Sequence, residues 1–575
     1  MKIKFLILAV SLVSLCISPV VAQEQTPRLD TKDRFVPEIG RHGMVATREK
    51  IATQVGVNIL KQGGNAVDAA VAVGFALAVT YPQAGNIGGG GFMMIHLAKE
   101  NKSIAIDYRE MAPAAADRDM YLNEDGSVDN ARSKFTRKAT GVPGTVAGMV
   151  HALENYGTMS LAQVIKPAYD LANDGFPIYN YLEGSLNARK ERMKKNAAAF
   201  KVFYKADGTS YKYGETFIQK DLAKSLKQIS DGGRDAFYKG EIAQKIVADM
   251  KENDGLITMK DMANYEVIER PAIIGSYKGY EIVTMPPPSS GGVHLVQIMN
   301  MLENDDLKAK GHNSAASLHL YIEAMRQAYA DRSKYLGDPD FSNVPVAELT
   351  SKRYAKITRD IISMDHARRS TDVAPALNLL AESPDTTHFS VMDKDGNAVS
   401  NTYTLNFSYG NGVMAPGTGI MMNNEMDDFS AKPGTPNGYG LIGGEANSVQ
   451  PRKRPLSSMT PTIVLKDGKP FFVTGSPGGS TIITVVLQSV LNVIEYDMNV
   501  FGAIAAPRIH HQWMPDAVMI EEGVSQDTKD ILTKMGHVIA PRKLTIGSLS
   551  AIMLKDGIYY GASDPRSMDS AAIGY

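Results

Sequence analysis

The sequence contains almost no cysteine and no excess of either charge. Cys16 is the only cysteine among the 575 residues, and it lies in an apolar N-terminal run that we expect to be removed. A mature chain without a thiol excludes cysteine catalysis and disulfide bonds. The formal net charge is -1, and 21% of the residues are charged. This balance favours neither nucleic acid nor an anionic membrane as a partner.

An apolar run lies at the N-terminus, and no other stretch reaches 18 uninterrupted apolar residues. Two lysines precede the run FLILAVSLVSLCISPVV, which ends at Ala22 in a small-residue context typical of signal-peptide cleavage. We therefore predict a signal peptide over residues 1–22 and an exported protein, located in the periplasm or secreted. A lipid-modified Cys16 is the alternative, although Leu15 stands where a lipoprotein signal has a small residue. The run is short for a stable anchor, so no membrane attachment is expected after cleavage.

Motifs for metals, nucleotides and serine nucleophiles are also missing. The eleven histidines are scattered, and no HExxH or comparable ligand spacing occurs. The glycine cluster GNIGGGG at 85–91 does not have the order of a dinucleotide fingerprint, and no P-loop lysine is present. In GSPGGS at 475–480 a proline follows the serine, which does not fit a nucleophile elbow. We predict no metal and no cofactor.

The N-terminal half has the spacing of helices. The segment TREKIATQVGVNILKQGG has apolar residues at helical intervals, with Thr47 in a position that suits an N-cap and a Gly-Gly end. A buried helix over 66–81 follows, then a glycine cluster and two strands, the second ending near Arg109. Helical patterns continue from about 114 to 380, interrupted by MPPPSSGG at 285–292.

After residue 385 the pattern changes to hairpins. A Lys-Asp-Gly turn recurs at 394–396, 466–468 and 555–557, each time between segments with the composition of strands. A long apolar helix, TIITVVLQSVLNVIEY, lies between the second and third turns. Antiparallel strands covered by helices predict an α+β fold with four layers in the order αββα, rather than a doubly wound parallel sheet.

The stretch DTTHFSVMDKDGNAVSNTYTLN, residues 385–406, places two threonines at the head of the first hairpin. A threonine hydroxyl is a weak nucleophile without a base beside it, and one recurrent base is the threonine's own α-amino group, with an unperturbed pKa near ~8. Thr386 has a free α-amino group only if the peptide bond after Asp385 breaks. The same hydroxyl can break it by attacking the carbonyl of residue 385, and strain in that peptide would help.

The hairpin predicts which residues lie near Thr386. Counting outward from a two-residue turn at 395–396 places Thr386 opposite Leu405. Thr404 and Asn406 then lie within one residue of the nucleophile, although a β-bulge would change which side chain faces it.

Each of these features also has an ordinary structural explanation. Paired threonines at the start of a strand are common because β-branched residues suit a pleated surface. Glycine clusters usually form tight turns, and acidic or hydroxyl pairs in loops often satisfy backbone groups. Taken singly, none of the segments establishes catalysis.

Taken together, eight segments closely resemble bacterial γ-glutamyltranspeptidase. They are, in chain order, GNIGGGGF, DYREMAP, TTHFSVMDKDGNAVSNTYTLN, NNEMDDFS, RPLSSMTPTIV, VTGSPGGS, APRIHHQW and GASDPR. The agreement runs from about residue 40 to the C-terminus. The resemblance implies the N-terminal-nucleophile hydrolase fold, an αββα sandwich, made as a precursor that cleaves itself. It implies a large chain of residues 23–385 and a small chain of residues 386–575, which form one heterodimer.

The resemblance also implies the catalytic and binding residues. Thr386 matches the nucleophile, Thr404 the threonine that supports it and assists processing, and Gly478 and Gly479 the oxyanion hole. Arg109 offers a planar fork to the α-carboxylate of a γ-glutamyl substrate. The other matched positions are Ser457 and Ser458, with hydroxyls for the carboxylate, Asn406, Glu425 and Asp428, where the family binds the α-amino group, and Tyr439, in the segment 432–444 that resembles a lid loop.

The resemblance therefore predicts a self-processing γ-glutamyltransferase and hydrolase acting on glutathione and related compounds. The acyl group on Thr386 would pass to water or to an amino acid or peptide. The nearest alternative is an acylase of the same fold, such as a cephalosporin acylase, although a glutaryl substrate has no amino group for Glu425 and Asp428. The alternative from another class is a periplasmic solute-binding protein that captures amino acids or glutathione with the same charged residues. Such a protein would remain one chain.

Overall fold

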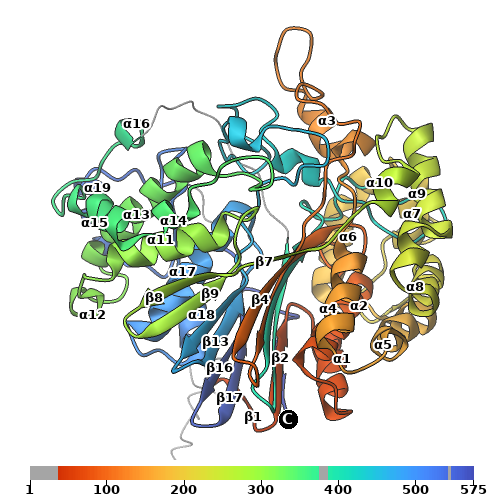
Figure 1. The fold of residues 1–575 in the computed structure, drawn as a ribbon, viewed down its shortest axis with the longest axis horizontal. Helices are drawn as coiled ribbons and strands as arrows, with labels where there is room; N and C mark the ends of the chain where they lie inside the picture. Colours follow the sequence, from red (N-terminus) through yellow and green to blue (C-terminus); the bar gives the residue numbers. More distant parts are fainter. Residues whose placement is uncertain (1–35, 374–385, 542–544) are drawn as a thin grey trace, which may run out of the picture. The chain divides into compact units, whose positions relative to one another are not determined.

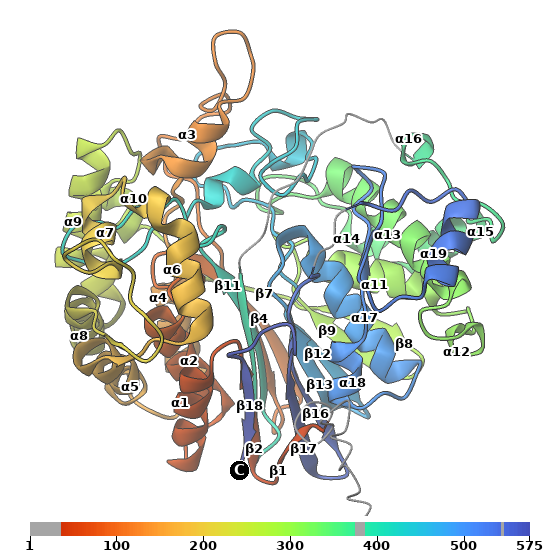
Figure 2. The ribbon, with the colours of Figure 1, turned by 180° about the vertical axis from the view of Figure 1, so that it is seen from behind.

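Two antiparallel sheets lie face to face between layers of helices (Figure 1, Figure 2). The computed structural model describes residues 36–373, 386–541 and 545–575. The predicted signal peptide, Cys16 and Asp385 lie outside the described residues. Residues Pro37–Tyr575 form one compact unit. The observed order of layers confirms the predicted αββα sandwich.

Within the described residues, each sheet has seven strands. Sheet A contains, in spatial order, β1 (Glu38–Gly40), β17 (Ile558–Ser563), β16 (Ser550–Lys555), β13 (Lys469–Gly475), β12 (Thr462–Lys466), β9 (Tyr280–Thr284) and β8 (Ile273–Tyr277). Sheet B contains β18 (Ala571–Gly574), β2 (Gly43–Thr47), β10 (Thr387–Asp393), β11 (Ala398–Thr404), β3 (Gly90–Leu97), β4 (Lys102–Tyr108) and β7 (Ile268–Arg270). Both sheets combine strands from before and after residue 386, so pieces cut at that point would share one core.

One helical layer covers sheet B and the other covers sheet A. The helices on the sheet B side are α1 (Lys50–Lys61), α2 (Ala66–Thr80) and α4 (Thr145–Tyr156), with α5 (Leu161–Asp174) and α8 (Lys220–Tyr238) packed outside them. The helices on the sheet A side are α11 (Gly291–Leu302), α17 (Ile482–Ile494) and α18 (Val500–Ala505), with α13 (Ala315–Tyr335) and α15 (Lys352–Asp360) beyond. No helix in the described ranges combines the length and apolar character that a bilayer span requires.

The remaining elements lie around these layers. The other helices are α3 (Asn130–Phe135), α6 (Asn180–Met193), α7 (Ala197–Phe203), α9 (Glu241–Glu252), α10 (Met259–Ala263), α12 (Leu307–Lys310), α14 (Val346–Leu349), α16 (Ser370–Val373) and α19 (Gln526–Lys534). Short 3-10 helices are η1 (Arg137–Ala139), η2 (Glu425–Asp428), η3 (Glu445–Asn447) and η4 (Gly479–Thr481). Two small sheets pair β5 (Phe176–Pro177) with β6 (Thr216–Phe217) and β14 (Ile509–His510) with β15 (Met519–Ile520).

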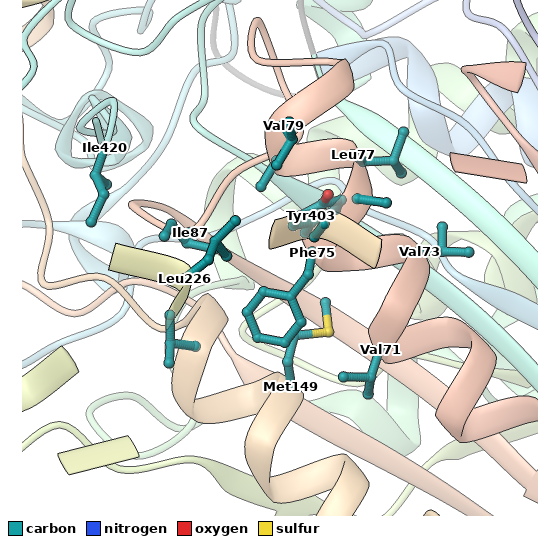
Figure 3. Close-up of a cluster of buried hydrophobic side chains, with 14 of the residues drawn as sticks. Val71, Val73, Phe75, Leu77, Val79, Ile87, Met149, Leu226, Tyr403 and Ile420 are labelled. Atoms are coloured by element: carbon teal, nitrogen blue, oxygen red, sulfur yellow. The ribbon is translucent and has the colours of Figure 1, made fainter. Parts of the chain in front are cut away.

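The inner strands β10 and β11 alternate between an apolar and a polar face. Tyr403 points toward α2 (Figure 3), where its hydroxyl donates to the carbonyl of Gly74 at 2.9 Å. Phe389 belongs to the same core cluster and packs edge-on against Tyr403. On the opposite face, His388 contacts the hydroxyl of Thr402 at 2.8 Å, between the two sheets. Since side chains alternate along a strand, Thr386 and Thr404 belong to this polar face.

The structure corrects two local predictions. The first helix is capped by Glu49, whose carboxylate accepts from the backbone N–H of Ile51 and Ala52, while Thr47 is the last residue of β2. In the first hairpin, Thr387 pairs with Tyr403. Continuing this register places Thr386 opposite Thr404, so the predicted pairing with Leu405 is wrong by one residue.

Candidate active site

Thr386 immediately precedes β10 and faces a second threonine. Its Oγ1 donates to Oγ1 of Thr404 at 3.3 Å, and both side chains are buried. The Thr404 Oγ1 also accepts from the backbone N–H of Asn406 at 2.8 Å. The two hydroxyls predicted to lie near each other are therefore in hydrogen-bond contact.

The glycine cluster at 85–91 allows β3 to approach the end of this hairpin closely. A Cβ added to Gly89 would lie 2.0 Å from the carbonyl oxygen of Thr404, and β3 pairs Gly90 with Thr404. Only a residue without a side chain allows this approach. The cluster thus brings β3 against the end of β11 and fixes the backbone of Thr404.

Gly478 and Gly479 lie between the end of β13 and the start of α17. Their φ values are 144° and 53°, in the region that favours glycine. Among the described residues, neither N–H donates to a protein acceptor. Unpaired N–H groups at the start of a helix attract negative charge, so this turn can stabilise an oxyanion.

Arg109 follows β4 and is completely buried. Its Nε donates to the carbonyl of Pro455 at 3.2 Å, Nη2 donates to Asp428 Oδ2 at 2.6 Å, and Nη1 contacts the carboxylate of Glu425. The carboxylates predicted for the substrate's amino group are thus bound to the predicted carboxylate-binding arginine. A guanidinium has five N–H groups, so two remain for a ligand.

Glu110, which the sequence analysis missed, adds a third carboxylate. It is completely buried, its Oε2 lies 3.6 Å from Arg109 Nη1, and neither oxygen has a hydrogen-bond partner among the described residues. Burial, opposed by Arg109, raises the pKa of Glu110 to about 7. Burial also raises the pKa of Glu425 well above its usual range, and the charge of Glu110 adds to this rise.

Polar atoms without partners face the predicted amino-group position. Asn406 donates through Nδ2 to the carbonyl of Asn424 at 3.0 Å, which leaves Oδ1 as an acceptor. Asn406 Oδ1 and Glu425 Oε2 are buried and have no hydrogen-bond partner within the described part of the chain. Because an unpaired buried acceptor is costly, both atoms favour a ligand that donates hydrogen bonds.

These groups surround one small cavity of about 20 Å³, roughly the room of one water molecule. It is lined by Arg109, Thr386, Thr404, Asn406, Glu425, Asp428, Tyr439, Leu441, Ser457, Ser458, Met459, Gly479 and Ile482. Every predicted site residue except Gly478, which adjoins Gly479, is in this lining. The apolar members Leu441, Met459 and Ile482 were not predicted.

The segment 432–444 contributes Tyr439 and Leu441 to the cavity lining. The Tyr439 hydroxyl donates to the carbonyl of Asn406 at 2.7 Å, and its ring packs edge-on against Phe407 at a centroid distance of 5.6 Å. The backbone N–H of Gly438 donates to Asp427 Oδ2 at 2.9 Å. A γ-glutamyl group is much larger than this cavity, so the lining must rearrange to admit it.

Metal ligands are not grouped within the described part of the chain. In residues 36–373, 386–541 and 545–575, no group of three or more His, Cys, Asp or Glu side chains is placed to hold a metal ion. The polar groups of the cavity are hydroxyls, amides, carboxylates and a guanidinium.

A threonine beside an inner strand of an αββα sandwich, near two N–H groups that have no acceptor among the described residues, is the arrangement of an N-terminal-nucleophile hydrolase. The family model described as Gamma-glutamyltranspeptidase matches residues 52–574, and this chain belongs to that family.

Three known proteins illustrate the similarity. The "Glutathione hydrolase proenzyme" of Escherichia coli (strain K12) is 53% identical over 545 residues, covering 95% of this chain and 94% of that relative. The crystal structure of Helicobacter pylori gamma-glutamyltranspeptidase has 48% identity and a TM-score of 0.56, covering 58% of this chain and 95% of that chain. The crystal structure of cephalosporin acylase from Bacillus halodurans has 26% identity and a TM-score of 0.83, covering 96% and 98%.

Proposed function

We propose that the protein is a γ-glutamyltransferase and glutathione hydrolase that matures by cutting its own chain before Thr386. The observation that carries the proposal is the cavity, because it joins a hydroxyl nucleophile to a group of charged residues of both signs. We call this group, Arg109, Glu425 and Asp428, the clamp. A free α-amino acid end carries a carboxylate and an ammonium group, and the clamp offers partners to both. The names of the relatives support glutathione as a substrate and a precursor as the initial form.

Self-cleavage would supply the missing base. The Thr386 hydroxyl oxygen attacks the carbonyl carbon of residue 385, the C–N bond breaks, and an ester forms while the Thr386 nitrogen takes up the proton. Water then hydrolyses the ester, which leaves a carboxylate on residue 385 and a free α-amino group beside the hydroxyl. Thr404, at 3.3 Å, orients the attacking hydroxyl. The products are residues 23–385 and 386–575, paired through the shared sheets.

The mature site would then transfer the γ-glutamyl group. The α-amino group takes the hydroxyl proton while Oγ1 of Thr386 attacks the γ-carbonyl carbon. The N–H groups of Gly478 and Gly479 stabilise the negative oxygen of the tetrahedral intermediate. Its collapse expels the leaving amine, which takes the proton, and leaves a γ-glutamyl ester. Water, an amino acid or a peptide attacks this ester and restores the free threonine.

The clamp would fix the substrate by exchanging ion pairs. The substrate carboxylate takes the remaining N–H groups of Arg109 and the hydroxyls of Ser457 and Ser458. Its ammonium group takes Glu425, Asp428 and the free Oδ1 of Asn406. Holding both charged ends orients the γ-carbonyl toward Thr386, which lowers the entropy cost of the reaction. The predicted signal at residues 1–22 supports export to the periplasm or the medium.

Acyl preference and the nucleophile are tested together. Purified protein should hydrolyse glutathione and γ-glutamyl anilide, and glutaryl anilide at least about 100-fold less well, since a glutaryl group has no ammonium group for Glu425 and Asp428. Thr386→Ala should be inactive and remain one chain. Thr387→Val is the matched control, because Thr387 is the adjacent threonine and its hydroxyl has no partner among the described residues. Equal glutaryl activity would instead favour an acylase, and an active Thr386→Ala variant would contradict the mechanism.

A further inference from the structure

A second buried guanidinium lies behind the serine pair of the cavity. Arg332, in α13, is 4% exposed. Its Nε donates to Ser290 Oγ at 3.0 Å, and Nη2 donates to Ser458 Oγ at 3.3 Å. Among the described residues it has no carboxylate as an ion-pair partner, unlike Arg109. A buried charge without a counter-ion is costly, so its retention here needs a reason.

Nearby groups help to keep the Arg332 side chain charged despite its burial. Burial lowers the pKa of Arg332 to about 10, Asp428 and Tyr329 oppose this fall, and Arg109 adds to it. The side chain therefore stays protonated at neutral pH. An anion bound at Ser458 would supply the counter-charge that the protein itself does not provide.

The hydrogen bond from Arg332 also determines whether the Ser458 hydroxyl donates or accepts toward a ligand. A guanidinium only donates, so Ser458 Oγ accepts from Arg332 and its own O–H is left to donate elsewhere. The neighbouring Ser457 Oγ accepts from the backbone N–H of Met459 at 3.1 Å, which leaves its O–H in the same situation. Both hydroxyls line the cavity. They are thereby fixed as donors, which suits a carboxylate and not an ammonium group.

The segment at 285–292 keeps this arrangement in place. Ser290 accepts from Arg332, and its backbone N–H and its hydroxyl both donate to the carbonyl of Ser457, at 2.8 and 2.7 Å. The hydroxyl of Ser289 donates to the carbonyl of Met459 at 2.6 Å. The interruption MPPPSSGG thus ties α13 to the serine pair.

We propose that Arg332 is a positioning residue that selects substrates with a free α-carboxylate. It acts by holding the Ser458 hydroxyl as a donor and by placing a second positive charge behind the position of that carboxylate. The inference rests on the proposed function and adds to it a residue outside the cavity lining. It predicts that much of the preference for an α-carboxylate over a neutral group depends on Arg332.

The test compares two substrates in three variants. The substrates are γ-glutamyl anilide and its analogue with an α-carboxamide, and the measured quantity is the ratio of their kcat/KM values. Arg332→Met should lower kcat/KM for the carboxylate substrate by about 10- to 100-fold, mainly through KM, because a charge-assisted contact is lost. The carboxamide substrate should change little, so the ratio falls at least about tenfold.

Two further variants keep the test decisive. Arg332→Lys retains the charge and should fold even if methionine is not tolerated, with a ratio lowered about three- to tenfold because the planar fork is lost. Arg326→Lys is the matched control, since Arg326 is in the same helix but pairs with Glu323 and Asp516, and its ratio should equal that of the wild type. An unchanged ratio in the folded, processed Arg332 variants would overturn the inference. Wild-type protein that cleaves no γ-glutamyl anilide would overturn the proposed function instead.

Discussion

The two ends of the cavity are built from opposite kinds of groups. Around Thr386 the polar groups are uncharged hydroxyls and backbone N–H groups. Around Arg109, by contrast, carboxylates and a guanidinium are buried against one another. In the proposed mechanism the uncharged end first cuts the chain and can transfer a γ-glutamyl group only after this cut supplies an amine, whereas the charged end is already assembled in the uncut chain. Processing and substrate recognition should therefore fail separately when each end is altered.

Removal of the clamp cation should have the largest effect on recognition. Arg109→Gln leaves Glu425 and Asp428 without their cation, and we expect kcat/KM for γ-glutamyl anilide to fall about 100-fold or more. Stability should fall by about 3 to 5 kcal/mol, since unpaired buried carboxylates remain. Steady-state kinetics and thermal unfolding measure both effects.

The same variant separates the two ends. Because Arg109 lies at the charged end, folded Arg109→Gln should still be cut into two chains. A second substitution, Glu425→Gln, should restore part of the stability by removing one unpaired carboxylate. A folded variant that stays uncut would show that the ends are not independent.

Removal of the supporting hydroxyl should affect the other end. Thr404→Val keeps the shape of the side chain but deletes the contact at 3.3 Å to Thr386. We expect processing and kcat to slow by about tenfold, the cost of one hydrogen bond with some reorganisation. Stabilisation of the protein by free glutamate, measured by thermal shift, should be unchanged. Equal processing rates in wild type and Thr404→Val would remove Thr404 from the mechanism.

The smallest effect is a change in how stability depends on pH. A carboxyl group whose pKa is raised on folding stabilises the protein at low pH, and this contribution is lost as pH rises through the folded value, about 7 for Glu110. Glu110→Gln removes this loss. The gain in free energy of unfolding of Glu110→Gln over wild type should therefore be larger at pH 8 than at pH 5, by about 1 to 3 kcal/mol.

Unfolding of both proteins at the two pH values checks this. Glu252→Gln is the control, because Glu252 is exposed on the outer helix α9, and it should give no such difference. The same advantage of Glu110→Gln at both pH values would contradict the buried, strained state of this carboxyl group.

Much of the fold followed from periodicity. The apolar run at 66–81 predicted α2, and the run from Thr481 predicted α17. Both helices are buried over nearly their whole length, so their patterns contain few polar residues. The layer order followed from alternating hairpins and helices, because such strands need helices to cover their outer faces.

The pattern of strand and turn residues did not predict the register of the first hairpin, although the sequence contains a signal for it. The Lys-Asp-Gly turns at 466–468 and 555–557 have the predicted two-residue form, with Lys466 paired to Lys469 and Lys555 to Ile558.

In the turn at 394–396, Asp393 takes the place of leucine before the lysine. Its Oδ1 accepts from the backbone N–H of Asp395 and of Asn397, both at 3.0 Å. An aspartate at this position favours a type I turn followed by a glycine with positive φ, which lengthens the loop to three residues. Gly396 has a φ of 86°, and the longer loop brings Thr404 opposite Thr386.

The charged contacts of the cavity could not be predicted from local patterns. Arg109 meets Glu425 and Asp428 across more than 300 positions of sequence, and Arg332 reaches Ser458 from a helix with no apolar stripe to reveal its orientation. The motifs identified which residues belong to the site. The partners of each charge depend on how the two sheets and their loops pack, which no spacing in the sequence encodes.

The most direct test of self-cleavage before Thr386 is the N-terminal sequence of the smaller fragment in purified, active protein. Self-cleavage before Thr386 predicts a fragment that begins Thr-Thr-His-Phe, and one uncut chain for Thr386→Ala. A fully active protein that consists of one unbroken chain, or a small fragment that begins at another residue, would contradict it.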